Sequence, residues 1–143
     1  IDRMMNETAT RETYRIKGET VITVNDYTGG RKFKDAVCYS FYPIDLHDKD
    51  GVKPRKLKHG VVPTIPRGAL IPKGSKNLMV AGRCLSSDRL ANSAARVQAS
   101  CMGMGQAAAV NAVLAAKLNL TPADVPLEKV HAELKKHGAI VPV

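Results

Sequence analysis

The sequence predicts an α+β fold that combines short strands with one long buried helix and one amphipathic helix near the C-terminus. Segments 14–24 and 39–46 are rich in β-branched or aromatic residues and contain glycine or proline, which is typical of short strands. Residues 93–118 are rich in alanine and lack proline, which predicts a helix. Beyond them, apolar residues recur at helical spacing and predict the amphipathic helix.

Length and composition limit the classes of protein to consider. A chain of 143 residues buries about two thirds of its unfolded surface if it folds alone, so a single core is expected. Its three cysteines are an odd number without a C-x-x-C pair, which argues against a disulfide scaffold and a zinc ribbon. The net charge of +9 favours anionic partners, but an aromatic content of 4% argues against specific nucleic-acid binding.

The first third of the chain is predicted to hold a tail, strands and a short helix. Residues 1–13 are polar and unpatterned, so we interpret them as a tail or extension. They lack the apolar segment of a signal peptide, and localisation stays open. After the strands, Asn25 or Asp26 is expected to cap a short helix whose body includes Phe33, Ala36 and Val37. Pro43 then keeps the following segment extended.

The small-residue helix is predicted to follow a buried strand. Residues 77–81 form a short apolar run that stops at Gly82, where unusual backbone angles are permitted. In the helix, alanine, glycine and cysteine recur every four residues in two rows, which lets another backbone or a flat cofactor come close. A membrane-spanning helix is not favoured, because Gln106 and Asn111 interrupt the run and alanine and glycine dominate it.

The last 23 residues predict a helix and a closing strand. Thr121 and Asp124 have the spacing of a capping box. Leu127, Val130 and Leu134 fall on one face of the helix, with charged residues outside. Gly138 should end it, and the apolar residues 139–143 are candidates for a strand.

Four polar residues are candidates for chemistry or binding. Asp45 and His47 lie on the same side of an extended segment, so the carboxylate could orient the imidazole for proton transfer. The alternative is that His47 begins a polar surface turn. Arg67 has the geometry to hold an anionic group, and Arg96 enters an apolar helix where its charge needs an acid or a bound anion. No spacing of histidine and cysteine supplies a metal site.

Several spaced blocks of the sequence resemble the C-terminal part of the FAD-dependent oxidoreductases. Residues 77–86 read NLMVAGRCLS, Arg96 follows, and residues 101–108 read CMGMGQAA. The same order of blocks continues upstream, at 11–26, 30–36, 42–47, 65–67 and 70–74. The resemblance covers roughly residues 10–140.

The resemblance implies a role for each half of the chain and for individual residues. Residues 14–72 would form the substrate side and residues 73–143 the flavin side of a C-terminal domain. His47, helped by Asp45, would handle a proton, and Tyr42 and Arg67 would hold the substrate. FAD would be contacted by Gly82, Arg83, Arg96, Ala99, Ser100 and Cys101. A helix N-terminus at this place would stabilise negative charge on the flavin.

The dinucleotide-binding unit of such enzymes is not found in the sequence. Residues 103–108 spell G-x-G-x-x-A, but they continue a helical run and follow no strand. We therefore expect a fragment that does not bind FAD tightly alone and that needs the missing dinucleotide-binding domain or an oligomer partner. Its small-molecule substrate cannot be named. The alternative is a non-catalytic module, related to polysaccharide lyases, that binds an acidic polysaccharide or a protein; neither specific nucleic acid nor membrane is an expected partner.

Overall fold

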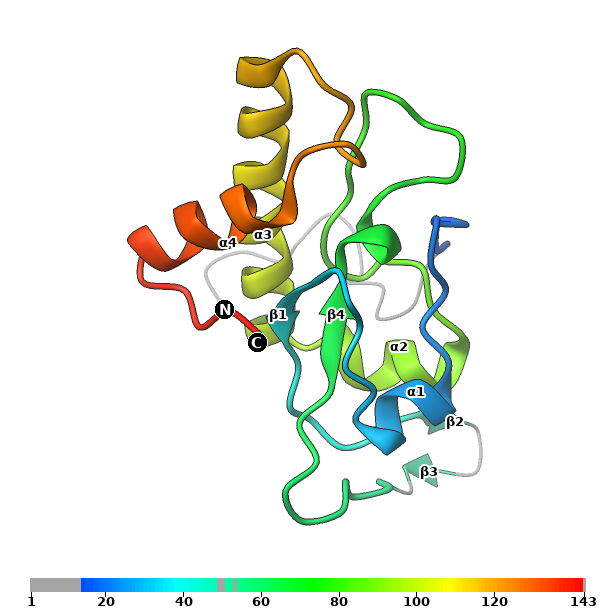
Figure 1. Cartoon of the computed structure of the whole chain (residues 1–143). Helices are drawn as coiled ribbons and strands as arrows, with labels where there is room; N and C mark the ends of the chain where they lie inside the picture. Colours follow the sequence, from blue (N-terminus) through cyan, green and yellow to red (C-terminus); the bar gives the residue numbers. More distant parts are fainter. Residues whose placement is uncertain (1–13, 49–50, 53, 143) are drawn as a thin grey trace, which may run out of the picture.

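The computed structural model describes residues 14–48, 51–52 and 54–142 and confirms a mixed α+β fold (Figure 1). Its helices and strands are, in chain order, α1 (Val24–Gly29), β1 (Ala36–Tyr39), β2 (His47–Asp48), β3 (Gly51–Val52), β4 (Thr64–Pro66), the 3-10 helix η1 (Arg67–Leu70), α2 (Arg89–Ala95), α3 (Gln98–Leu118) and α4 (Leu127–Lys136). The predicted tail, residues 1–13, lies outside the described residues.

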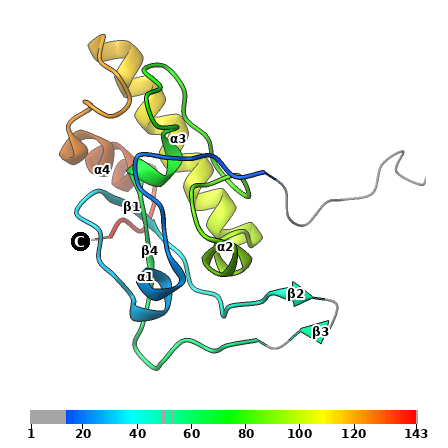
Figure 2. The ribbon, with the colours of Figure 1, turned by 90° about the vertical axis from the view of Figure 1, so that its right-hand side faces the viewer.

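Strands β1 and β4 form the central pair of the fold. They are antiparallel, with Cys38 opposite Ile65 and Tyr39 opposite Thr64, and the register shifts once between Ala36 and Cys38. Helix α3 packs on β1, and in Figure 1 the strand pair lies between α3 and α1. The three residues of β4 are all buried. The β2–β3 pair extends away from this core (Figure 2).

Helix α3 contributes one face to the core and leaves the other exposed. Its buried residues are Ser100, Met104, Ala107, Asn111 and Ala115. The small-residue rows predicted from the sequence only partly match this face. A side chain at Gly103 would come within 3.3 Å of Cys38, whereas one at Gly105 would meet nothing within 4 Å. The predicted long helix is therefore buried along one face, and its outer rows face solvent.

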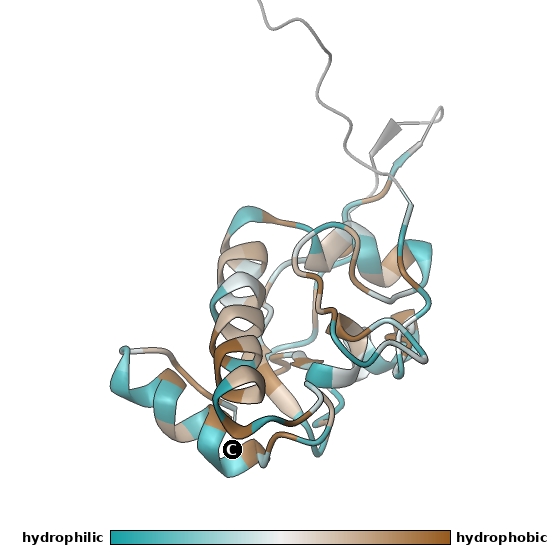
Figure 3. Ribbon diagram, turned by 90° about the horizontal axis from the view of Figure 1, so that it is seen from above, coloured by the Kyte–Doolittle hydropathy of each residue, from teal (hydrophilic) through white to brown (hydrophobic). Residues whose placement is uncertain are grey.

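Helix α4 packs against α3 as the amphipathic pattern predicts. Val130 and Leu134 are buried, and its outer surface is hydrophilic (Figure 3). His131 is half-buried, and its Nε2 lies 2.8 Å from the carbonyl oxygen of Ala36 in β1. This contact joins the last helix to the central strand pair.

The predicted helix over residues 93–118 is two helices. Asp88 caps α2, its Oδ1 accepting a hydrogen bond of 2.7 Å from the Ala91 amide, so the helix begins earlier than predicted. The chain turns at Arg96, and Val97 is extended with φ −67° and ψ 155°. Cys101 donates from its thiol to the Arg96 carbonyl at 3.2 Å, which satisfies a group that the break leaves free.

The structure also corrects the predicted cap and length of the first helix. Thr23, rather than Asn25 or Asp26, caps α1 in a reciprocal capping box with Asp26, and the left-handed Gly30 ends it. Ala36 and Val37 consequently belong to β1 instead of the helix. Upstream, the predicted strands reduce to single bridges, Gly18 with Pro72 and Ile22 with Ser87.

Two apolar runs do not form the predicted strands. Residues 77–81 have no strand partner; Val80 donates to the Leu70 carbonyl at 2.8 Å, and Leu78 is 54% exposed. Residues 139–142 are not a strand either, although Val141 and Pro142 are buried. Thr121 bonds Asp124 at 2.6 Å, but α4 begins later, after Pro126, so this pair is not a capping box.

Helix α3 is long and apolar enough, by length and composition, to cross a membrane, and 28% of its most apolar window is buried. A core helix of a globular protein meets the same criterion. Here the buried residues of α3 pack on β1 and α4, which is the arrangement of a core helix.

Candidate functional site

A polar cluster lies where the segment after β1 meets the α2–α3 junction. His47 Nε2 is 3.3 Å from Asp45 Oδ2, and Arg96 Nη2 is 3.9 Å from the same oxygen. Arg96 also donates to the Asp45 carbonyl at 3.2 Å. The structure thus brings together three residues that the sequence places 51 positions apart, counting from Asp45 to Arg96. An acid, an imidazole and a guanidinium are in contact at one place.

The position of Asp45 is fixed by the surrounding backbone. Its amide donates to Ser93 Oγ in α2 at 3.2 Å, and the preceding Ile44 is paired with Arg55 by two backbone hydrogen bonds of 2.9 and 3.0 Å. The side chain of Asp45 is 19% exposed and that of His47 is 41% exposed. The carboxylate is therefore held in place, while the imidazole is open to solvent or to a ligand.

Arg96 is buried without all of its donors being satisfied. Its side chain is only 10% exposed, yet Nε has no hydrogen-bond partner among the described residues. The other such atom there is Ser87 Oγ. A buried guanidinium N–H that loses water without gaining an acceptor costs free energy, and an exposed arginine would avoid that cost. Arg96 is thus a fixed positive charge that is only partly paired.

A chain of buried hydroxyl groups positions Tyr42 and the first turn of α3. Ser100 Oγ is 2.8 Å from Ser40 Oγ, which lies 2.9 Å from the Tyr27 hydroxyl. Tyr27 in turn donates to the Tyr42 carbonyl at 3.1 Å. Burial raises the pKa of Tyr27, so it remains a protonated donor. Sequence reasoning did not identify Tyr27 or Ser40, because serine and tyrosine far apart in a sequence carry no pairing signal.

The predicted flavin-side residues gather at the start of α3. Gly82 has φ +87°, a conformation that glycine adopts without strain, and a side chain there would lie 3.7 Å from Cys101 Sγ. Burial raises the pKa of the Cys101 thiol, with Arg83 and Arg96 close enough to oppose that shift. Ser100 turns its hydroxyl into the core, whereas Ala99 is exposed.

The N-terminus of α3 has no side-chain cap. Its N-cap residue, Val97, offers no oxygen to the first-turn amides. With 21 residues the helix has a full macrodipole, equivalent to about half a positive charge at this end. The uncapped amides and the Arg96 guanidinium lie within one turn along the chain, so the junction is electropositive. It suits a ligand with negative charge or carbonyl oxygens.

The structure does not bring Arg67 to this cluster. Its Nη1 donates to the Val125 carbonyl and lies 3.5 Å from Asn111 Oδ1, in the second half of α3. Asn111 is 13 residues beyond Gln98, or about 20 Å along the helix at 1.5 Å per residue. Burial lowers the pKa of Arg67, opposed by Asp35 and Asp124. These contacts give Arg67 a role in joining segments of the fold, and its predicted role in substrate binding has no support in its position.

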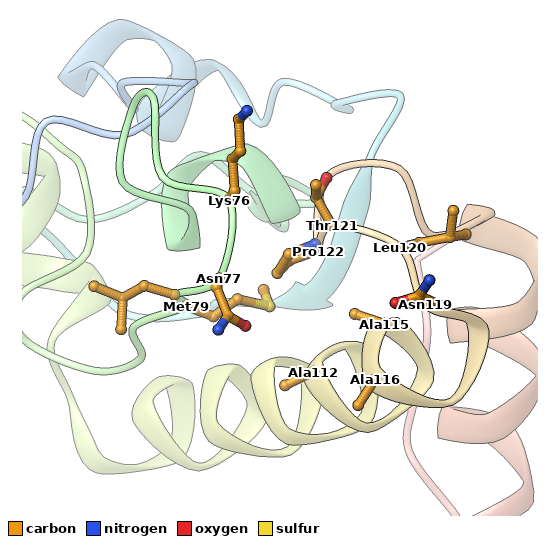
Figure 4. Close-up of a pocket in the computed structure, with 11 residues that line it drawn as sticks. Lys76, Asn77, Met79, Ala112, Ala115, Ala116, Asn119, Leu120, Thr121 and Pro122 are labelled. Atoms are coloured by element: carbon orange, nitrogen blue, oxygen red, sulfur yellow. The ribbon is translucent and has the colours of Figure 1, made fainter.

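A pocket of about 420 Å³ lies at this second end of α3 (Figure 4). Residues from three segments line it, around Asn77, Ala112 and Pro122. None of the residues predicted for catalysis or binding is among them. A group of three potential metal ligands is likewise not found in the described part of the chain.

Comparison with known families identifies the chain. The model of a family described as FAD dependent oxidoreductase matches residues 2–134. The chain belongs to this family. No curated protein and no solved structure matches it.

The junction residues of this FAD dependent oxidoreductase fit the isoalloxazine part of the cofactor. The flavin ring presents carbonyl oxygens and a nitrogen that gains negative charge on reduction. The uncapped first turn of α3 offers matching donors, and the Arg96 guanidinium adds a fixed positive charge next to it in the chain. Gly82 leaves the approach to Cys101 free of a side chain. The residues that would hold the ring are thus the amides of α3, Arg96 and Gly82.

The adenosine diphosphate part of FAD has no corresponding cradle among the described residues. A phosphate-binding G-x-G-x-x-A loop must lie between a strand and the start of a helix. Residues 103–108 lie inside α3, where their amides are engaged in the helix. This confirms that the lone motif in this segment is not a dinucleotide-binding loop.

Proposed function

We propose that this chain forms the ring side and the substrate side of an FAD-dependent oxidoreductase, positioning both for hydride transfer. The observation that carries the proposal is Arg96. It is a buried guanidinium, with one donor unused, between the Asp45–His47 pair and the uncapped start of α3. A ring bound at the α3 terminus would accept from the first-turn amides, with the positive charge of Arg96 and the Asp45–His47 pair close by. FAD, when bound, supplies the acceptor for the hydride.

His47 is the group that takes the proton in this proposal. Because its Nε2 faces the Asp45 carboxylate, the tautomer with hydrogen on Nε2 is favoured and Nδ1 is left as the proton acceptor. A substrate C–H would lose its hydride while the neighbouring O–H or N–H gives its proton to Nδ1. Asp45 orients the imidazole and stabilises it once charged. The 41% exposure of the His47 side chain leaves room for a substrate.

The electropositive junction supports the charge balance of the same step. Hydride transfer increases electron density at the carbonyl edge of the flavin. The α3 amides and Arg96 are fixed donors that need no reorganisation as that charge develops. The hydroxyl chain from Tyr27 to Ser100 keeps the first turn of α3 fixed relative to the Tyr42 segment. Ring side and substrate side are therefore coupled through the core.

An FAD titration followed by absorbance tests the proposal. It would be run on this chain alone and on the chain together with the dinucleotide-binding domain that the proposal requires. We expect the flavin spectrum to shift and the protein to retain FAD only in the second sample, because the pyrophosphate needs a cradle. If FAD is not retained in either sample, the proposal fails and binding through the basic surface becomes the leading hypothesis.

A further inference from the structure

We infer that the substrate has a flat apolar group and an anionic group, and that both bind in one cleft beside the Asp45–His47 pair. This rests on the proposed function, since it gives a substrate class to the same site. The cleft, here called the aromatic cleft, encloses about 310 Å³ and is lined by Phe41, Tyr42, Pro43, Lys56 and Leu57.

The aromatic residues of the cleft are exposed in a chain that has few of them. The sequence contains four tyrosines and two phenylalanines. Two of these six are neighbours in this cleft, with Phe41 70% exposed and Tyr42 38% exposed. Burying a phenylalanine side chain gains about 1.5–3 kcal/mol, which the fold forgoes here. Two solvent-facing rings with Pro43 and Leu57 beside them offer a surface on which a planar group can stack.

The cleft is held by backbone contacts on both sides. Tyr27 donates to the Tyr42 carbonyl, and the Ser40 amide donates to the Pro63 carbonyl at 3.0 Å. Beyond Pro43, the two backbone bonds between Ile44 and Arg55 join the two walls of the cleft. The aromatic side chains are therefore displayed on a fixed backbone, which reduces the entropy lost when a ligand binds.

The charge of the cleft has one sign. Lys56 is the charged residue of its lining, and its neighbours Arg55 and Lys58 are exposed as well. Asp45, the acid closest along the segment, is paired with His47 and Arg96. A carboxylate or phosphate on the ligand would find a cation at the edge of the apolar surface. A neutral or cationic ligand would gain nothing from it.

The position of the cleft matches the proposed chemistry. Tyr42 is three residues from Asp45, a span of at most about 10 Å for an extended chain. The inference places the rings of a fused two-ring carboxylate in the aromatic cleft, with the rest of the ligand directed along this segment towards His47. The cleft would hold the inert part of the substrate while the reacting carbon lies at the imidazole.

Probe binding by calorimetry on this chain, without FAD, tests the inference. The probes are 2-naphthoate, the uncharged 2-naphthylmethanol, and cyclohexanecarboxylate, which is anionic but not flat. We expect 2-naphthoate to bind most tightly of the three. Phe41→Ala should weaken it by about tenfold, the upper end of an aromatic contact. Lys56→Gln should weaken 2-naphthoate and leave 2-naphthylmethanol unchanged.

Two variants of exposed residues outside the cleft serve as matched controls. Ile140→Ala removes an apolar side chain that is 82% exposed, and Lys135→Gln removes an exposed charge on α4; neither should change binding. Equal affinity for the three probes, no binding, or insensitivity to both cleft variants would overturn the inference. The FAD titration is read on a different ligand, so its failure removes the proposed function while leaving the probe affinities as measured.

Discussion

Two arginines pack against opposite ends of α3 and differ in how their donors are used. Arg67 gives its hydrogen bonds to the Val125 carbonyl and Asn111, and two acids, Asp35 and Asp124, lie close enough to favour its charge. The Arg96 side chain is 10% exposed, but it reaches only the Asp45 carbonyl and a carboxylate oxygen 3.9 Å away, and its Nε has no partner among the described residues. Arg67 therefore joins separate segments of the fold, whereas the hydrogen bonds of Arg96 do not use all of its donors.

The difference shows what separates a structural from a functional charge. Both residues were predicted from sequence to bind ligands, because each arginine lies next to apolar or proline-containing segments. The partners of Arg67 come from elements far apart in the chain, so its removal should loosen the fold. The partners of Arg96 leave one of its donors unused at the α2–α3 junction, next to the uncapped amides of α3. Removing Arg96 should therefore change ligand binding more than stability. The predictions below test this contrast, from the largest expected effect on stability to the smallest.

Replacing Arg67 should cause the largest loss of stability. Arg67→Met removes charge-assisted hydrogen bonds to α3 and to the Val125 segment, so we expect the free energy of unfolding to fall by about 2–3 kcal/mol. Urea denaturation followed by circular dichroism measures it. Arg96→Met should cost less, about 1 kcal/mol, because it removes one good hydrogen bond. An equal or larger loss for Arg96→Met would contradict the contrast.

Asn111, the partner of Arg67 on α3, should give the next largest effect. Its buried amide donates to the Pro122 carbonyl at 2.9 Å, and Asn111→Leu would leave that carbonyl unpaired. We expect a loss of about 1–3 kcal/mol in the same urea assay. The matched control is Ala112→Asn, which places an asparagine on the exposed side of the same helix turn and should cost at most about 0.7 kcal/mol. Similar losses for the two variants would show that the buried amide has no special role.

The region between the two arginines should respond to alkaline pH. Burial raises the pKa of Cys38, which packs against Gly103 of α3, from 9.0 to about 12. The folded state therefore keeps its proton where the unfolded state loses it, so stability is full below pH 9 and falls as the pH rises towards 12. At one pH unit above the unfolded pKa the loss is about 1.4 kcal/mol. Cys38→Ala should remove this part of the pH dependence, as measured by urea denaturation. If the difference in free energy of unfolding between wild type and variant is the same at pH 8 and pH 10, Cys38 is not shielded from water.

His47 should have the smallest effect on folding. It is 41% exposed and its ion pair with Asp45 is long, so His47→Gln should change the free energy of unfolding by less than about 1 kcal/mol. In the complete flavoenzyme the same variant should slow substrate oxidation, because the proton acceptor is lost. If the variant is strongly destabilised and oxidises substrate at an unchanged rate, His47 belongs to the fold rather than to the chemistry.

Local patterns in the sequence predicted several elements and part of the candidate site. The amphipathic spacing of Val130 and Leu134 predicted α4, and the two-residue spacing of Asp45 and His47 predicted that their side chains meet. The burial of an arginine near the start of an apolar helix was also visible in the sequence. These features depend on residues within one turn or one strand of each other.

Features that depend on distant partners were not predictable. The Asp88 carboxylate accepts hydrogen bonds from Ala91 and, at 2.6 Å, from the Val24 amide, so it sets the start of α2 and fixes α1 beside it. The apolar run 77–81 predicts a strand, but its sequence does not reveal whether another strand lies beside it. The partners of Arg67 are likewise 44 and 58 residues away. Tertiary contacts of this kind override local propensity.

The most direct test of the central claim is the FAD titration in the presence of the dinucleotide-binding domain, comparing Arg96→Met with Arg67→Lys. Circular dichroism first confirms that both variants are folded. The account predicts that Arg96→Met weakens FAD binding at least about tenfold, because the fixed positive charge beside the start of α3 is lost. Arg67→Lys should bind FAD as the wild type does. Unchanged affinity for Arg96→Met, or a loss confined to Arg67→Lys, would contradict the assignment of the α2–α3 junction as the ring side.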